Sequence, residues 1–193
     1  MRPFDYLSSI LLLFTAITLG ELTMGLAYAL NGETYATFYL PHTMFLGATF
    51  FGSIDYATRI YSLRKVGEWK FISLALILIP GMLWLLGTKL LLPDIDPPTH
   101  YDFYEVLQNN KSRMYLIVIF YIVSVQSAFH IVYGTIHKST VFIYIAFIIF
   151  SIYCLISLEQ WTDYLMSGLS LLLTLVLGLW KGSRLRDNQP YEE

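Results

Sequence analysis

The sequence predicts an all-α integral membrane protein, a polytopic bundle of about six transmembrane helices with both termini in the cytoplasm. Three observations lead to this prediction: the composition is apolar, long apolar stretches recur, and basic residues return on alternate connections. Of 193 residues, 56% are hydrophobic and 13% are charged, whereas a soluble domain carries roughly a quarter charged residues. The mean hydropathy of +0.57 agrees with this class.

The apolar stretches have the length of membrane spans. About 20 helical residues cross the hydrocarbon core, because a helix rises about 1.5 Å per residue against a thickness of about 30 Å. The stretches are continuous rather than alternating, which favours helices over barrel strands. The expected spans are 7–30, 37–60, 70–92, 114–136, 140–158 and 163–181. They form a single domain over residues 1–181, and residues 182–193 form a cytoplasmic tail.

Basic residues on alternate connections orient the predicted bundle. The connection after the second span, the short one after the fourth and the C-terminal tail carry them: Arg64, Lys65, Lys70, Lys138, Lys181, Arg184 and Arg186. The other connections are acidic or nearly uncharged. Because basic loops stay in the cytoplasm, both termini are expected there. We therefore expect a multi-pass protein of the bacterial inner (plasma) membrane.

The connection over residues 93–113 is the only long one, and we expect it on the outer side. It begins with the proline-rich run 93–98, which predicts turns because proline lacks an amide donor. Beyond it, Tyr101, Tyr104 and Leu107 share one face of a short helix. We interpret this segment as an interfacial helix, either a simple connector or a lid.

Polar residues within the outer half of the spans form the first group of candidate site residues. Charged groups are costly in hydrocarbon and usually face the interior of a bundle. Glu21 on the first span and His42 on the second lie within about one helical turn in depth, so they could pair. Secondary candidates are Thr18, beside Glu21, and the outer residues Glu159, Asp163, Ser167 and Ser170.

A second group of candidates lies in the inner half. Asp55 and Arg59 have the i, i+4 spacing of a pair along one helix. Gln126, His130 and Tyr133 form a polar stripe on the fourth span. Each set also has a structural interpretation: an interfacial ion pair for the first, and an interhelical hydrogen-bond network for the second. Serine and threonine hydroxyls commonly bond their own backbone.

Several chemistries can be set aside. The sequence contains no HExxH, Walker or GxSxG motif and no potassium filter. The single cysteine, Cys154, excludes an internal disulfide and a cysteine-based zinc site. His42 and His130 differ in depth, which disfavours a shared haem. We therefore expect no metal or cofactor. A net charge of −2 without a basic patch also disfavours nucleic acid.

Three hypotheses about function stay open, and no catalytic residue can be named. The leading one is a transporter, a channel or a membrane subunit of one, which moves a small solute, ion or proton through an intramembrane polar site. In that case Glu21 and His130 are the best binding candidates. The second is an enzyme acting on a lipid or isoprenoid. The third is a structural or signalling subunit. Besides the lipid bilayer, the expected partners are further copies of the chain or a larger membrane complex.

Overall fold

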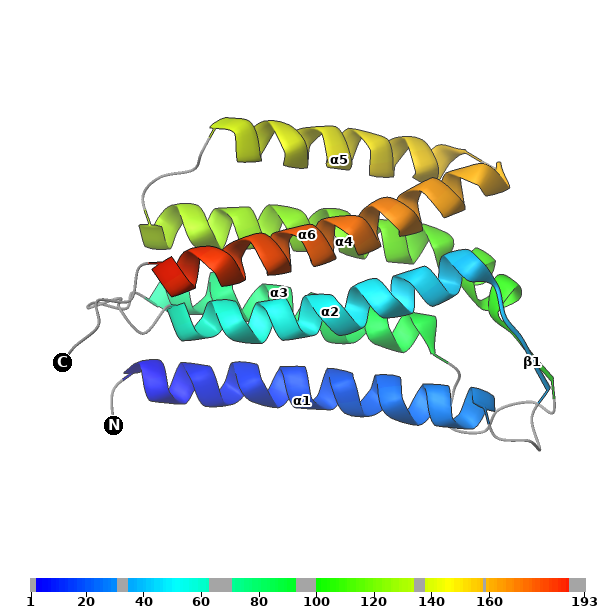
Figure 1. Ribbon diagram of the computed structural model, residues 1–193, viewed down its shortest axis with the longest axis horizontal. Helices are drawn as coiled ribbons and strands as arrows, with labels where there is room; N and C mark the ends of the chain where they lie inside the picture. The colour runs from blue at the N-terminus through cyan, green and yellow to red at the C-terminus, as the bar shows by residue number, and fades with distance from the viewer. Residues whose placement is uncertain are drawn as a thin grey trace.

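The chain folds into a bundle of long helices, shown by a computed structural model that describes residues 3–30, 35–62, 71–92, 100–133, 138–157 and 159–187. Within these ranges the structure contains six helices and two short strands (Figure 1). The helices are α1 Pro3–Leu30, α2 Leu40–Ser62, α3 Phe71–Leu91, α4 Phe103–Tyr133, α5 Lys138–Ile156 and α6 Gln160–Asp187. The strands are β1 Tyr35–Thr37 and β2 His100–Asp102. The predicted all-α class is thus confirmed.

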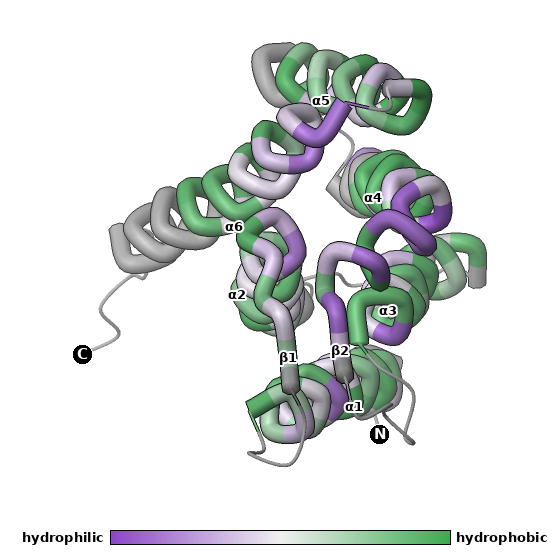
Figure 2. The backbone as a smooth tube through the Cα atoms, turned by 90° about the vertical axis from the view of Figure 1, so that its right-hand side faces the viewer, coloured by the Kyte–Doolittle hydropathy of each residue, from purple (hydrophilic) through white to green (hydrophobic). Residues whose placement is uncertain are grey.

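The helices run side by side, and the two ends of the bundle differ. α1 begins and α6 finishes at the same end, which we call the terminal end (Figure 1). β1 and β2 pair in parallel at the opposite end, which we call the strand end, with Tyr35 opposite His100. Figure 2 looks onto the strand end and shows hydrophilic residues gathered there, near the starts of α4 and α6.

The region expected as an outer loop is mostly helical. Asp102 accepts a hydrogen bond from the amide of Tyr104 at 2.8 Å, so it caps a helix that starts at Phe103. That helix is α4, which continues without a break to Tyr133. Residues 103–113 are thus the first turns of α4, and the described part of this region contains no helix separate from it. The face that carries Phe103 and Leu107 is buried in the protein core.

Part of the tail expected beyond residue 181 is also helical. α6 continues to Asp187, so the first residues of that tail belong to the helix. Good helix formers such as Lys181, Arg184 and Leu185 favour this extension. Residues 188–193, like residues 93–99, lie outside the described part of the chain.

Two pairs of helices pack most closely. α3 packs closely against α4, α2 packs closely against α6, and α1 lies along α2 and α3. The main core joins these helices through Leu22, Phe45, Leu91, Leu107, Tyr115 and Met166. α5 lies on α4 and meets α6 only near the strand end, and the two diverge toward the terminal end (Figure 1).

The surface of the bundle is rich in large apolar side chains. Phe142 and Ile156 on α5 are 75% and 74% exposed. In the described part of the chain, Asp5–Leu30 and Leu74–Leu91 are long and apolar enough to cross a membrane, and Val141–Ile156 is a shorter apolar helix. These segments give limited support for membrane association. The bundle of six spans stays a prediction.

One close approach between α2 and α3 yields a stability prediction. The indole of Trp84 lies directly against Gly52, and its Nε1–H donates to the Thr49 carbonyl at 3.0 Å and to the Ser53 hydroxyl at 2.6 Å. A methyl group at Gly52 would overlap the ring. We expect Gly52→Ala to cost about 1–3 kcal/mol, as overpacking does, and to lower the Tm measured in detergent.

The matched control for this prediction is Gly20→Ala on α1, where an added Cβ meets nothing within 4 Å. Alanine is the better helix former, so we expect this variant to be as stable as the parent or slightly more stable. Equal melting of the two variants would contradict the tight fit of Trp84 against α2.

Candidate functional site

The most completely buried charge in the described part of the chain is the carboxylate of Asp163, in the first turn of α6. Its side chain is 0% exposed. It accepts hydrogen bonds from Gln108 Nε2 at 2.7 Å and from the Tyr115 hydroxyl at 2.9 Å, and Lys111 Nζ lies 2.8 Å away. We call Gln108, Lys111, Tyr115 and Asp163 the polar quartet. Its three α4 members have helical spacing that places them on one face.

The charges of the quartet are satisfied on both sides. The Lys111 side chain is only 11% exposed, and its ammonium also donates to the Ser157 carbonyl at 3.2 Å. Asp163 lies near the N-terminus of α6, where the helix dipole favours a negative charge. Buried charges persist only with such partners, because an unpaired one loses its hydration without compensation. The quartet is therefore a fixed connection between α4 and α6.

This connection is confined to the strand end. Gln160 on α6 adds a second bridge, since its Nε2 donates to the Tyr104 hydroxyl on α4 at 3.0 Å. Among the described residues, α4 and α6 otherwise make little contact with each other. They are thus tied at one end and separated along the rest of their length.

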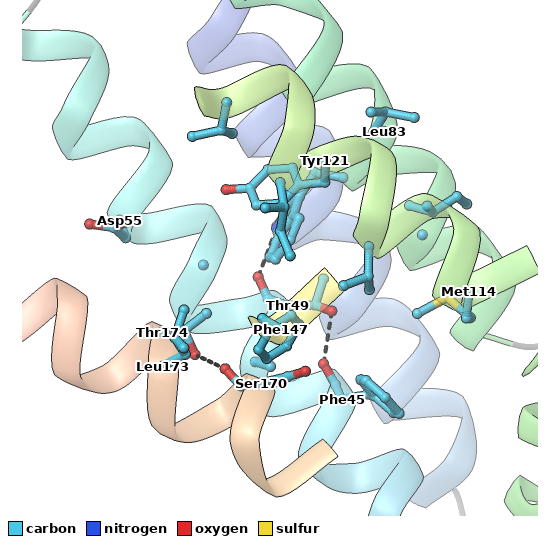
Figure 3. Close-up of a pocket in the computed structure, with 18 of the residues that line it drawn as sticks. Phe45, Thr49, Asp55, Leu83, Met114, Tyr121, Phe147, Ser170, Leu173 and Thr174 are labelled. Carbon is cyan, nitrogen blue, oxygen red and sulfur yellow. Dashed lines mark hydrogen bonds between the residues drawn. The ribbon is translucent and has the colours of Figure 1, made fainter. Parts of the chain in front are cut away.

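A pocket lies between α4 and α6 (Figure 3). It has a volume of about 100 Å³ and walls from α2, α3, α4, α5 and α6. Most of the wall is hydrocarbon, including Phe45, Ala48, Trp84, Ile122, Phe147 and Leu173. Met114 lines it one helical turn from Lys111, and Ser170 lines it about two turns from Asp163. The quartet therefore lies beyond the strand end of the pocket, one to two helical turns from residues that line it.

The two threonine hydroxyls on the pocket wall are occupied by hydrogen bonds to backbone carbonyls. Thr49 Oγ1 donates to the Phe45 carbonyl at 2.8 Å, and Thr174 Oγ1 donates to the Ser170 carbonyl at 3.0 Å. Figure 3 shows both bonds. The hydroxyl of Ser170 is buried and has no hydrogen-bond partner among the described residues. The pocket therefore presents mainly C–H groups to whatever enters it.

The structure separates the two outer candidates, Glu21 and His42. Glu21 pairs with Lys89 on α3 at 2.7 Å, and both side chains are partly exposed. His42 is fully buried, and its Nε2–H donates to the Leu91 carbonyl at 2.6 Å. Its ring lies 4.5 Å from that of Phe103, centroid to centroid. The pair that their depths suggested is not formed, because other partners on α3 lie closer.

The inner candidates do not share one cavity in the described part of the chain. Asp55 lines the pocket at its far end from the quartet. His130 is exposed on α4. Arg59, Gln126 and Tyr133 belong to helices, but their side chains lie outside what the structure describes.

The secondary candidates make mostly local contacts. Thr18 Oγ1 and Ser167 Oγ donate to backbone carbonyls three or four residues earlier, at 2.8 Å and 3.2 Å. Glu159 accepts a hydrogen bond from the indole of Trp161. Of the secondary candidates, Asp163 belongs to the quartet and Ser170 lines the pocket.

Sequence analysis missed the α4 half of the quartet. Gln108, Lys111 and Tyr115 lie in or beside the stretch 93–113, which resembles a polar loop. Their i, i+3, i+7 spacing is the signal that could have identified them, because it places a lysine and two hydrogen-bond donors on one helical face. The pocket left no such signal, since distant parts of the sequence build it.

Comparison with known proteins does not extend this description. No family model, curated protein or solved structure matches the chain. Within the described residues, no group of three or more His, Cys, Asp or Glu side chains could hold a metal ion. The quartet and the pocket are therefore the features of the molecule that point to a function.

The quartet yields a double-mutant prediction. Lys111→Met or Asp163→Leu alone leaves one buried charge unpaired, so each should cost about 3–5 kcal/mol. The double variant removes both charges and should recover most of that loss. Thermal unfolding in detergent measures the coupling. Additive losses in the double variant would show that the two charges do not act as a pair.

Proposed function

We propose that this protein is a six-span membrane carrier, whose central pocket holds a small, largely apolar solute while the quartet closes the strand end. The observation that carries the proposal is the pocket itself, which lies between α4 and α6 where these helices are joined at only one end. Carriers commonly bind their solute in the middle of a bundle and expose it to one side at a time.

The distribution of apolar side chains supports the membrane part of the proposal. Every helix exposes large apolar groups on its outward face. Examples are Leu13 on α1, Ile72 on α3, Phe120 on α4 and Ile149 on α5. A soluble monomer rarely exposes extensive apolar patches. In a bilayer, lipid chains would cover these side chains.

The ends of the bundle support the proposed orientation. Lys138 begins α5, and Lys181 and Arg184 lie in the last turns of α6, so these basic positions belong to the terminal end. Asp102 and Glu159 precede α4 and α6 at the strand end. Basic residues favour the cytoplasmic side. The proposal therefore places the terminal end in the cytoplasm and the strand end outside.

The walls of the pocket favour an apolar solute over an ion or a proton. Conduction of an ion requires polar groups that replace its hydration shell. Glu21 and His42 make separate contacts elsewhere, and the hydroxyls of Thr49 and Thr174 bond backbone carbonyls. A solute with a hydrocarbon surface needs no such replacement.

The lipid-enzyme hypothesis also fits an apolar pocket but has less support from its residues. Asp163, the buried carboxylate of the quartet, already has three donors around it. Among the described lining residues, the groups able to exchange a proton with a bound molecule are Asp55, Tyr121 and Tyr144, together with the hydroxyls. Each of these three side chains already interacts with another group of the protein.

Thiol labelling from each side of the membrane tests the proposed carrier. Cys154→Ser removes the native thiol, and Thr49→Cys introduces one on the pocket wall. In oriented proteoliposomes, a small membrane-impermeant thiol reagent should react faster from the terminal end than from the strand end. Adding the double substitution Lys111→Met, Asp163→Leu should speed labelling from the strand end by about tenfold, equivalent to about 1.4 kcal/mol of lost closing free energy.

Two controls make this test specific. Glu159→Gln changes an exposed carboxylate four residues before Asp163 and should leave the labelling unchanged. Ala16→Cys lies on the exposed face in the middle of α1, which the proposal covers with lipid, so it should stay unlabelled from both sides with or without the quartet. The carrier proposal fails if labelling of the pocket is equal from both sides, or if loss of the quartet leaves the strand end closed.

A further inference from the structure

We infer that the pocket binds one unbranched acyl chain of a membrane lipid, which enters sideways between α5 and α6. The inference names a solute class for the proposed carrier and rests on that proposed function. Its three supports are the shape of the pocket, the chemistry of its wall and the position of the helices that border it.

The pocket is elongated along the helices. On α2 its wall runs from Phe45 to Asp55, and on α4 from Met114 to Val125, so it extends over roughly 15 Å of helix. A water-sized group occupies roughly 10–15 Å³ of such a cavity. A volume of about 100 Å³, spread over this length, therefore has room for several small groups in a row. An unbranched methylene chain has this form.

The wall matches the chemistry of a hydrocarbon chain. Besides the hydroxyls already described, the Trp84 Nε1–H bonds the Thr49 carbonyl and the Ser53 hydroxyl on its own side of the pocket. Phe45, Ile122 and Leu173 supply carbon surface on three different helices. A polar solute would lose its hydration here and gain few hydrogen bonds in exchange. A methylene chain gains burial instead, about 0.8 kcal/mol for each CH₂.

The arrangement of α5 and α6 explains how a lipid chain would arrive. The two helices meet near the strand end and diverge toward the terminal end (Figure 1). Tyr144 and Phe147 on α5 line the pocket, as do Leu173 and Thr174 on α6. The outward face of α5 is apolar and exposed, with Ile149 as an example. In a bilayer, lipid chains would lie against α5 and α6, on the side of the pocket that these four residues line.

Trp84 provides a direct reporter of an occupied pocket, because it lies on the wall. Replacing Trp69, Trp161 and Trp180 with Phe leaves it as the single tryptophan. The probe is phosphatidylcholine with one of its two chains dibrominated, since bromine quenches a nearby indole. If the pocket takes either chain of the lipid equally, half of the bound chains carry bromine. The fluorescence of Trp84 should then fall by about half relative to vesicles of unbrominated phosphatidylcholine.

Pocket-filling variants separate a chain in the pocket from lipid around the bundle. Ala48→Leu adds carbon inside the pocket, and the same change at Ala16 places it on the exposed face of α1. Gly87→Val fills the pocket from α3, where a Cβ makes ordinary contact with Ile117 at 3.4 Å. We expect Ala48→Leu and Gly87→Val each to abolish most of the quenching and Ala16→Leu to leave it unchanged.

Competing lipids decide the class of chain. Unbrominated straight-chain phosphatidylcholine should relieve the quenching in proportion to its fraction, and the methyl-branched diphytanoyl lipid should relieve it less. Equal relief by both lipids would overturn the assignment of an unbranched chain. Quenching that is the same in Ala48→Leu, Gly87→Val and Ala16→Leu would overturn binding in the pocket altogether.

The quenching experiment and the thiol-labelling experiment can give a negative result independently of each other. Quenching that depends on the pocket, together with equal thiol labelling from both sides, would leave a bound lipid and remove the carrier. Sided labelling without pocket-dependent quenching would leave a carrier and remove the acyl chain as its solute.

Discussion

The buried ion pair between Lys111 and Asp163 is the interaction on which the arrangement of the bundle depends. It joins α4 to α6 at the strand end, with hydrogen bonds from Gln108 and Tyr115 completing the contact. Replacing such a pair with apolar groups of similar volume is often neutral for stability, whereas removing one partner is costly. We therefore interpret the pair as a device that specifies which ends of α4 and α6 meet, more than as a source of net stability.

The central pocket follows from this constraint. Since α4 and α6 are joined only at the strand end, the space between them is left to side chains from the remaining helices. On the opposite side, Trp84 lies against Gly52 and bonds α2, so α2 and α3 close the pocket there. Elsewhere the core is densely packed, as around Leu91 and Leu107, so the pocket between α4 and α6 is a local feature.

The sequence predicted the helices well where hydropathy alone decides them, as in α1, α3 and α5. It failed at the start of α4, because Gln108 and Lys111 look like loop residues until their partner Asp163 is known. The same limit applies to single sites. Counting residues gave His42 a depth, but its partner is the Leu91 carbonyl, 49 positions away. A one-dimensional pattern shows which face a residue occupies, and it leaves open which neighbour that face meets.

The separation of polar and apolar groups inside the bundle argues for the kind of molecule it handles. Polar groups concentrate in the quartet, where each one has a partner and no site is left for an ion. Along the pocket, Thr49 and Thr174 turn their hydroxyls to backbone, which leaves their methyl groups for contact. A permeant ion would need an unpaired polar group in the quartet and several free oxygens in the middle of the bundle, whereas on the described pocket wall the hydroxyl of Ser170 is the one buried polar group without a hydrogen-bond partner. A hydrocarbon chain needs neither, because burial alone holds it and a closed polar end sets how deep it can reach.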